Sequence, residues 1–119
     1  MNIESEIFKK CRVDRNKLED YGFTKNDENY IYKKNFLNDK FQAFITIDKK
    51  GTISGKVIDL QMDDEYTNIR TEMVGDFVSS VRESYKDILK DIKKNCFTKE
   101  YFIGKQTNRI TKYIIKKIS

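Results

Sequence analysis

Residues 59–70 read DLQMDDEYTNIR and begin with four carboxylates, Asp59, Asp63, Asp64 and Glu65. Carboxylate oxygens are the ligands that Mg²⁺ and Ca²⁺ prefer, and a pair of carboxylates with different pKa values performs acid–base catalysis. The run lacks the alternating ligands, central glycine and terminal glutamate of an EF-hand loop. A solvated turn is therefore the favoured interpretation, with metal binding and acid–base chemistry as alternatives.

The second half of this run mixes hydrogen-bond donors and acceptors, namely Tyr66, Thr67, Asn68 and Arg70. Such side chains often satisfy backbone groups where a strand ends and a helix begins. The same set would also suit a small anion or the loop of a partner protein. The sequence favours the structural role and leaves the binding role open.

Four cations near the carboxyl end follow one another at spacings of four, three and four residues, which places Lys105, Arg109, Lys112 and Lys116 on one side of a helix. Residues 1–97 carry 18 basic and 18 acidic side chains, so the net charge of +5 comes from residues 98–119. A basic stripe of this kind can follow a phosphate backbone and release counterions from it. Taken alone, the stripe favours a solvated helix face, because cations also suit the negative end of the helix dipole.

Several classes of enzyme lack their usual residues in this chain. Histidine is absent, which removes the commonest general base and the commonest metal ligand. Cys11 and Cys96 are far apart and do not form a zinc-binding cluster, and we interpret both as small apolar residues. The sequence also has no phosphate loop, nucleophile elbow or dinucleotide fingerprint. We therefore expect no catalytic residue, no metal and no cofactor.

Targeting signals are missing as well. A transmembrane helix requires a run of about 18 apolar residues, and the sequence has none. The first residues, MNIESEIFKKCRV, have charges where a secretory signal has its apolar core. Two cysteines without a signal peptide fit a reducing compartment, so we predict a cytoplasmic protein that has no membrane partner.

The amino-terminal half predicts short helices followed by a sheet. Residues 3–11 have a helical apolar pattern, and Asp14 is placed to cap a second helix that Gly22 ends. Residues 29–60 alternate in hydropathy and predict a three-stranded antiparallel meander. Its hairpin at 41–60 turns at DKKG, and Gly55 within the return strand indicates a bulge or a close backbone approach.

The clearest helix is predicted at 75–96, where the apolar residues share about a third of the circumference. They are Phe77, Val78, Val81, Tyr85, Ile88, Leu89, Ile92 and Cys96. Thr98 is placed to cap a final helical segment. The predicted fold is a single α+β domain over 1–119, with a small antiparallel sheet of three or four strands covered by the helix at 75–96 and further helices at both ends.

A series of segments in this order carries a family resemblance: GKVIDL, EYTNIR, GDFVSSVRESYKDILKDIKKNCF and YF…QTNRITKYI. Together with IESEIFKKCRV and LEDYGF…YIYKKNFL, it resembles the amino-terminal module of MmcQ/YjbR-like proteins from low-GC Gram-positive bacteria. In those longer proteins the module precedes the YjbR domain proper, which is absent from this chain. The family is often labelled DNA-binding, so the resemblance implies an association with nucleic acid.

The resemblance also implies a shared polar cluster. If the helix at 75–96 and the last helix both pack beside the end of the sheet, these side chains converge. The members of the cluster are Asp59, Glu65, Tyr66, Thr67, Asn68, Arg70, Arg82, Gln106, Asn108 and Arg109.

Three classes of function are compatible with these features. A module that binds DNA or RNA through its basic last helix is favoured, because charge and resemblance agree. A protein-interaction module is the alternative, and would expose an apolar patch of several hundred Å². An enzyme is the least favoured, and would need a concave pocket that holds carboxylates of perturbed pKa.

Overall fold

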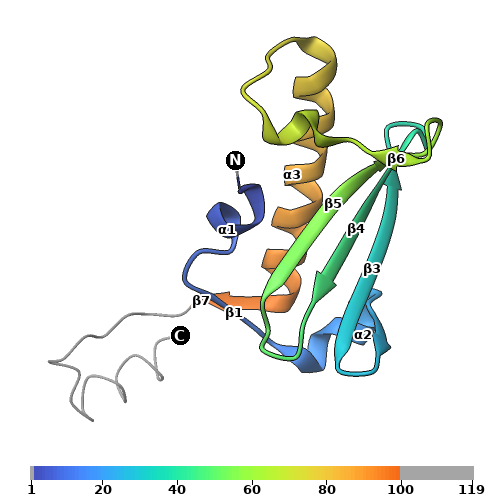
Figure 1. The fold of residues 1–119 in the computed structure, drawn as a ribbon. Helices are drawn as coiled ribbons and strands as arrows, with labels where there is room; N and C mark the ends of the chain where they lie inside the picture. The colour runs from blue at the N-terminus through green and yellow to red at the C-terminus, as the bar shows by residue number, and fades with distance from the viewer. Residues whose placement is uncertain (1, 100–119) are drawn as a thin grey trace, which may run out of the picture.

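The computed structural model describes residues 2–99, and these residues fold around one hydrophobic core. The elements in chain order are α1 (Ile3–Ile7), β1 (Cys11–Val13), η1 (Arg15–Lys17), α2 (Leu18–Tyr21), β2 (Thr24–Asn26), β3 (Asn29–Phe36), β4 (Phe41–Ile47), β5 (Ile53–Asp59), β6 (Asp64–Glu65), η2 (Thr67–Arg70), α3 (Asp76–Cys96) and β7 (Phe97–Lys99). They confirm the predicted α+β class and the predicted long helix, which Gly75 precedes as its N-cap (Figure 1).

The main sheet is an antiparallel meander in which each strand pairs with the next along the chain, in the order β2-β3-β4-β5-β6. It has five strands rather than three or four, because a short strand is added at each edge. β2 and β6 are three and two residues long, and a strand that short shows no alternation of hydropathy. The predicted central hairpin is confirmed, with Phe41 opposite Asp59 and Ile47 opposite Ile53.

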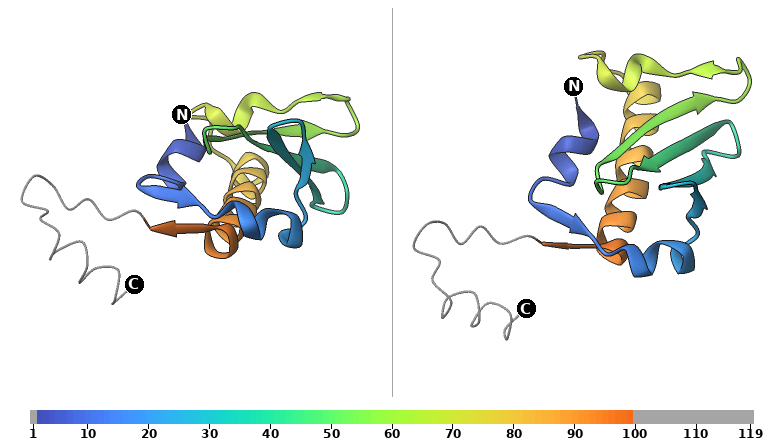
Figure 2. Two further views of the ribbon diagram at one scale, coloured as in Figure 1. Left: turned by 90° about the horizontal axis from the view of Figure 1, so that it is seen from below. Right: turned by 60° about the horizontal axis from the view of Figure 1, so that its bottom comes forward.

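The sheet buries one face and leaves the other open. Along β4, Phe41, Ala43, Ile45 and Ile47 are buried, whereas the residues between them are only half-buried. α3 runs across the buried face, and within residues 2–99 no helix covers the opposite face (Figures 1 and 2). None of the helices in this part of the chain has an apolar stretch long enough for a lipid bilayer.

The face of α3 that meets the sheet agrees with the prediction at most positions. Its buried residues are Val78, Val81, Tyr85, Leu89, Ile92 and Cys96. Phe77 is an exception, because its side chain is 62% exposed. Its ring lies 5.9 Å from the ring of Phe41 and 6.1 Å from that of Tyr66, so neighbours contact it on one side only.

Gly55 lies where the Tyr85 side chain of α3 approaches β5. The strand pairs continuously through it, opposite Ile45, so the sheet has no bulge here. A Cβ atom at this position would overlap the hydroxyl oxygen of Tyr85 and lie 2.8 Å from Cδ1 of Ile45. The glycine therefore permits the close backbone approach that its place in a strand indicates.

The amino-terminal segment packs along α3, with α1 beside its middle at Tyr85 and with η1 and α2 beside its last residues. Asp14 caps the η1 turn by accepting a hydrogen bond from the Asn16 amide, and Gly22 ends α2 with a φ of 132°, as predicted. A second, two-stranded sheet joins β1 to β7. Thr98, predicted to cap a last helix, instead lies in β7 opposite Arg12, and the predicted helix beyond it lies outside the described residues.

We predict that Gly55→Ala lowers the free energy of unfolding by about 1–3 kcal/mol, because the added methyl group overpacks the contact with Tyr85. The neighbouring substitution Ser54→Ala is the control, since Ser54 is exposed. Urea unfolding of both variants measures the difference. Equal midpoints for the two variants would contradict the close approach.

Candidate functional site

The carboxylates of residues 59–70 stabilise their own turn. The Oδ1 atom of Asp59 accepts hydrogen bonds from the amides of Gln61 and Met62, at 3.0 and 3.1 Å. Asp64 accepts a hydrogen bond from the Glu65 amide at 2.8 Å. Among residues 2–99, no group of three or more acidic, cysteine or histidine side chains is placed to hold a metal ion.

Arg70 points away from this turn and into the core. Its guanidinium donates two hydrogen bonds of 2.9 Å to the two oxygens of Glu4 and one of 2.7 Å to the carbonyl of Gly55. The hydroxyl of Tyr85 also donates to Glu4. These contacts join α1, β5, η2 and α3, and they use the carboxylate that would otherwise be the best candidate for an acid or base.

The protonation of this network follows from its contacts. Burial raises the pKa of Glu4, but the hydrogen bonds from Arg70 and Tyr85 outweigh it and hold the pKa below the usual value. Burial, together with the hydrogen bond to Glu4, raises the pKa of Tyr85. Glu4 is therefore ionised and Tyr85 is neutral at physiological pH, and the arrangement is a stable ion pair rather than an acid–base pair.

Arg82 holds the loop that precedes α3. Its Nε donates to the carbonyl of Ile69 at 2.9 Å, and its Nη2 donates to the carbonyls of Asn68, Thr71 and Met73 at 3.2, 3.2 and 3.0 Å. These are the carbonyls of a turn and a loop, which have few partners of their own. One guanidinium thus fixes the backbone path from η2 to the start of α3.

Among residues 2–99, the members of the predicted polar cluster make different contacts, and the structure joins Arg82 to Asn68. Asp59 lies at the β5–β6 turn, Arg70 lies against Glu4, and Arg82 binds the loop that contains Asn68. Glu65 and Thr67 are exposed, and the Tyr66 ring packs against Phe41 at 5.3 Å. The other predicted residues lie outside the described part of the chain, and they are Lys105, Gln106, Asn108, Arg109, Lys112 and Lys116.

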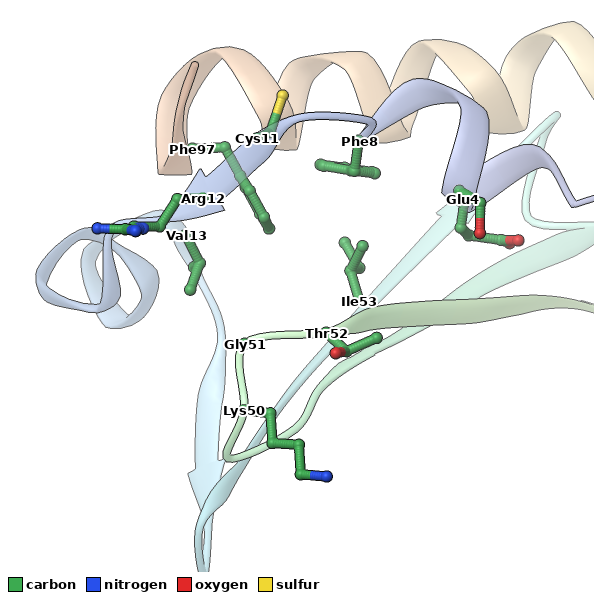
Figure 3. Close-up of a pocket in the computed structure, with 11 residues that line it drawn as sticks. Glu4, Phe8, Cys11, Arg12, Val13, Lys50, Gly51, Thr52, Ile53 and Phe97 are labelled. Carbon is green, nitrogen blue, oxygen red and sulfur yellow. The ribbon is translucent and has the colours of Figure 1, made fainter. Parts of the chain in front are cut away.

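A pocket of about 420 Å³ lies between the β1–β7 ribbon, α1 and the β4–β5 hairpin (Figure 3). Phe8, Ile53 and Phe97 face its centre, and the rings of Phe8 and Phe97 lie 4.6 Å apart. The sulfur of Cys11 and the guanidinium of Arg12 point away from that centre. Glu4, Ser5, Lys50 and Thr52 also line the pocket, and the Glu4 carboxylate among them is bonded to Arg70 and Tyr85.

Neither cysteine has the surroundings of a nucleophile. Burial raises the pKa of the Cys96 thiol to about 11, so this thiol is neutral at physiological pH. The Cys11 thiol donates a long hydrogen bond of 3.5 Å to the carbonyl of Lys9. Both cysteines are free, as predicted.

The open face of the sheet carries an aromatic residue between two cations. Phe44, half-buried in the middle of β4, lies opposite Lys33 on β3 and opposite Lys56 on β5. The two ammonium groups lie 5.3 and 5.4 Å from the centre of its ring, which is the distance of a cation–π contact. The two ammonium groups are therefore held over the Phe44 ring by cation–π attraction.

A hollow of about 590 Å³ extends from Phe44 toward the β2 edge of the sheet. Its lining combines apolar, amide, hydroxyl and ammonium groups, from Gly22, Thr24, Lys25, Asn26, Ile31, Lys33 and Phe44. The alternation of hydropathy along residues 41–47 predicts that Phe44 faces solvent. The lysines that flank it belong to two other strands, so only the register of the sheet identifies the group.

Comparison with known proteins finds no match to this chain among family models, curated proteins or solved structures. The resemblance to MmcQ/YjbR-like proteins therefore stays a prediction.

We predict that Glu4→Gln lowers the free energy of unfolding by about 1–3 kcal/mol at neutral pH, because Arg70 keeps a charge without its carboxylate. This is less than the usual cost of breaking a buried pair, since solvent reaches part of Arg70. Glu6→Gln, on the exposed side of the same helix, is the control.

The two variants should also differ in how their free energy of unfolding depends on pH. A carboxylate of lowered pKa contributes stability above its unfolded pKa of about 4.3, and this contribution is lost as the pH falls through the lower folded value. Urea unfolding across this range should therefore show a smaller loss of stability in acid for Glu4→Gln than for the wild type or Glu6→Gln. An identical acid loss in all three proteins would contradict the role of Glu4.

Proposed function

We propose that this domain binds single-stranded nucleic acid, DNA or RNA, on the open face of its sheet. The observation that carries the proposal is the Phe44 ring between the ammonium groups of Lys33 and Lys56. Unpaired bases stack on aromatic side chains, and a base that replaced the two ammonium groups over the ring would free them to contact the phosphates on either side of it. A double helix keeps its bases inside the stack, so the arrangement favours a single strand.

The surroundings of Phe44 suit a chain of nucleotides. Ile31 and Ile58 are half-buried on the same face and offer apolar contact to bases next to the stacked one. Gln42 and Asn35 bond to each other at 3.1 Å and carry further donors and acceptors. The hollow toward β2 is large enough for an additional base, with Lys25 and Asn26 at its wall.

The basic residues near the carboxyl end fit the same proposal. Lys105, Arg109, Lys112 and Lys116 lie in the segment that supplies the charge excess of the chain and would add sequence-independent contacts to phosphates. The resemblance to a family often labelled DNA-binding points in the same direction. We propose a binding module rather than an enzyme, acting in the cytoplasm, where two free cysteines persist.

A protein-interaction module is the second candidate. A different surface favours it, since exposed apolar residues gather between Leu60 and Phe77. The two functions use separate parts of the molecule, and substitutions can therefore test them separately.

We predict that Phe44→Ser weakens binding to a labelled random single strand by roughly 5- to 150-fold, since each stacked base contributes about 1–3 kcal/mol. Lys33→Glu with Lys56→Glu should weaken binding further and reduce its salt dependence, because two phosphate contacts are lost. Fluorescence anisotropy between about 50 and 200 mM salt measures both effects. Lys90→Glu with Lys94→Glu is the matched control, since both lysines are exposed on α3, across the sheet from Phe44.

Substituting Lys105, Arg109 and Lys112 by Glu measures how much the carboxyl-terminal segment contributes to nucleic-acid binding, compared with the sheet. If this variant loses binding and Phe44→Ser does not, the strand binds the carboxyl-terminal segment instead of the sheet. A wild-type protein that fails to bind at the lower salt concentration would overturn the proposal.

A further inference from the structure

One edge of β5 has no neighbouring strand over most of its length. On one side β5 pairs with β4 from end to end, whereas on the other side β6 pairs with Ile58 and Asp59 only. Among residues 2–99, no strand lies beside residues 53–56 on this second side. An open strand edge presents backbone amides and carbonyls to which a further strand can bond.

The contacts of β5 show which backbone groups point to this edge. The carbonyl of Val57 accepts a hydrogen bond from the Tyr66 amide at 2.8 Å, and the carbonyl of Gly55 accepts one from Arg70 at 2.7 Å. Backbone groups alternate in direction along an antiparallel strand, so the amide and carbonyl of Ile53 and the amide of Gly55 also point away from β4. An added strand would bond to these three groups.

A groove runs along the same edge, between β5 and α1. It consists of the pocket of about 420 Å³ described above and a second hollow of about 570 Å³ that extends to Arg70. The two hollows adjoin, because both are lined by Glu4, Ser5, Thr52 and Ile53. The outward backbone groups of Ile53 therefore lie where the apolar part of the groove meets its polar part (Figure 3).

The side chains of β5 alternate along the groove. Ile53 lies opposite Ile47 of the core face, and it points to the centre of the pocket with Phe8 and Phe97. Thr52 and Ser54, on either side of it, are exposed. In a strand added here, the residue opposite Ile53 would point into the pocket and its two neighbours would point to solvent. The groove therefore fits an extended segment that has one apolar side chain between two polar ones.

The charges of the groove favour acidic side chains at those polar positions. The lining contains the cations Arg12, Lys50 and Arg70 and a single carboxylate, Glu4, which is bonded to Arg70. Lys50 is exposed and extends from the β4–β5 turn beside Thr52 (Figure 3). A carboxylate next to the apolar side chain of the segment would be attracted to this end of the groove.

We propose that the open edge of β5 at Ile53 and Gly55 binds an extended, acidic and apolar segment of a partner protein by strand addition. The walls of the groove are fixed before the partner arrives. Arg70 joins α1 to β5 by bonding to Glu4 and to the Gly55 carbonyl, and Arg15 bonds to the Lys49 carbonyl in the β4–β5 turn. Binding therefore orders the segment alone, which lowers its entropic cost. Because Arg70 occupies the Gly55 carbonyl, the pairing ends there and the added strand is short.

The test is a titration of the full chain with the blocked peptide Ser-Asp-Leu-Asp-Ser, followed by NMR of the backbone amides. We expect the amide signals of Ile53 and Gly55 to shift, and the exchange of the Ile53 amide hydrogen to slow in the complex. Methylation of the leucine nitrogen removes the donor to the Ile53 carbonyl and should weaken binding about 2- to 12-fold, the worth of one hydrogen bond. Replacing the leucine by serine should weaken it at least about tenfold, because the pocket then receives no apolar side chain.

Exchanging charges tests the preference for an acidic segment. Lys50→Glu should bind Ser-Asp-Leu-Asp-Ser more weakly than the wild type and Ser-Lys-Leu-Lys-Ser more tightly, because the charge at the β4–β5 turn is reversed. Lys34→Glu is the matched control, since Lys34 is exposed on β3 and lies beyond β4 from the groove. This control should leave the affinity for both peptides unchanged.

Three results would overturn the proposal: amide signals of Ile53 and Gly55 that do not move at millimolar peptide, equal binding of the methylated peptide, or a Lys50→Glu variant that keeps the preference for the acidic peptide. Slow exchange of the Ile53 amide in the free protein would also contradict it, because another part of the chain would then already pair with the edge. The nucleic-acid proposal is tested separately, since Phe44→Ser changes the other face of the sheet and should leave peptide binding intact.

Discussion

The Glu4 carboxylate accepts hydrogen bonds from Arg70 and Tyr85, and this contact positions most of what lies around the start of α3. It connects the first helix of the chain to a turn 66 residues later. A buried ion pair adds little to stability compared with an apolar contact, yet it has one geometry, whereas an apolar contact tolerates several. Because Arg70 ends the η2 turn, its attachment to Glu4 fixes where Tyr66 lies and where the chain enters the loop toward α3. Gly55 completes the arrangement, since it makes room for the Tyr85 hydroxyl beside the carboxylate.

Much of this fold could be predicted because its main elements are long and periodic. β4, β5 and α3 each repeat their hydropathy pattern over seven residues or more, so their buried faces follow from the sequence. β1 and β7 could not be predicted, since each has three residues and the two are separated by the whole sheet and α3. Phe77 fits the helical pattern and is nevertheless exposed, because periodicity predicts which side of a helix is apolar and does not predict where the sheet beneath it ends.

The polar residues show a different limit. Composition identified residues 59–70 as a segment whose many polar groups need hydrogen-bond partners. In the structure Asp59 bonds to amides of its own turn, Arg70 bonds to Glu4, and carbonyls of the segment accept hydrogen bonds from Arg82. The identity of each partner depends on contacts between distant segments, which no local pattern encodes. Phe44 is the reverse case. Its strand position was evident, and its significance appears only when the register places one lysine on either side of it.

The distribution of charge gives different parts of the molecule opposite preferences. Residues 1–97 are neutral as a whole, with 18 basic and 18 acidic side chains. Residues 59–76 hold six of the acidic and one of the basic side chains, so the remainder of this part has 17 basic and 12 acidic ones. A polyanion is therefore repelled from the end of the molecule where α3 begins and attracted elsewhere, including the open sheet face with Lys33 and Lys56. A basic segment has the opposite preference. Because the sheet separates its open face from α3, a nucleic acid bound as proposed on the open face would leave the acidic end of the molecule accessible.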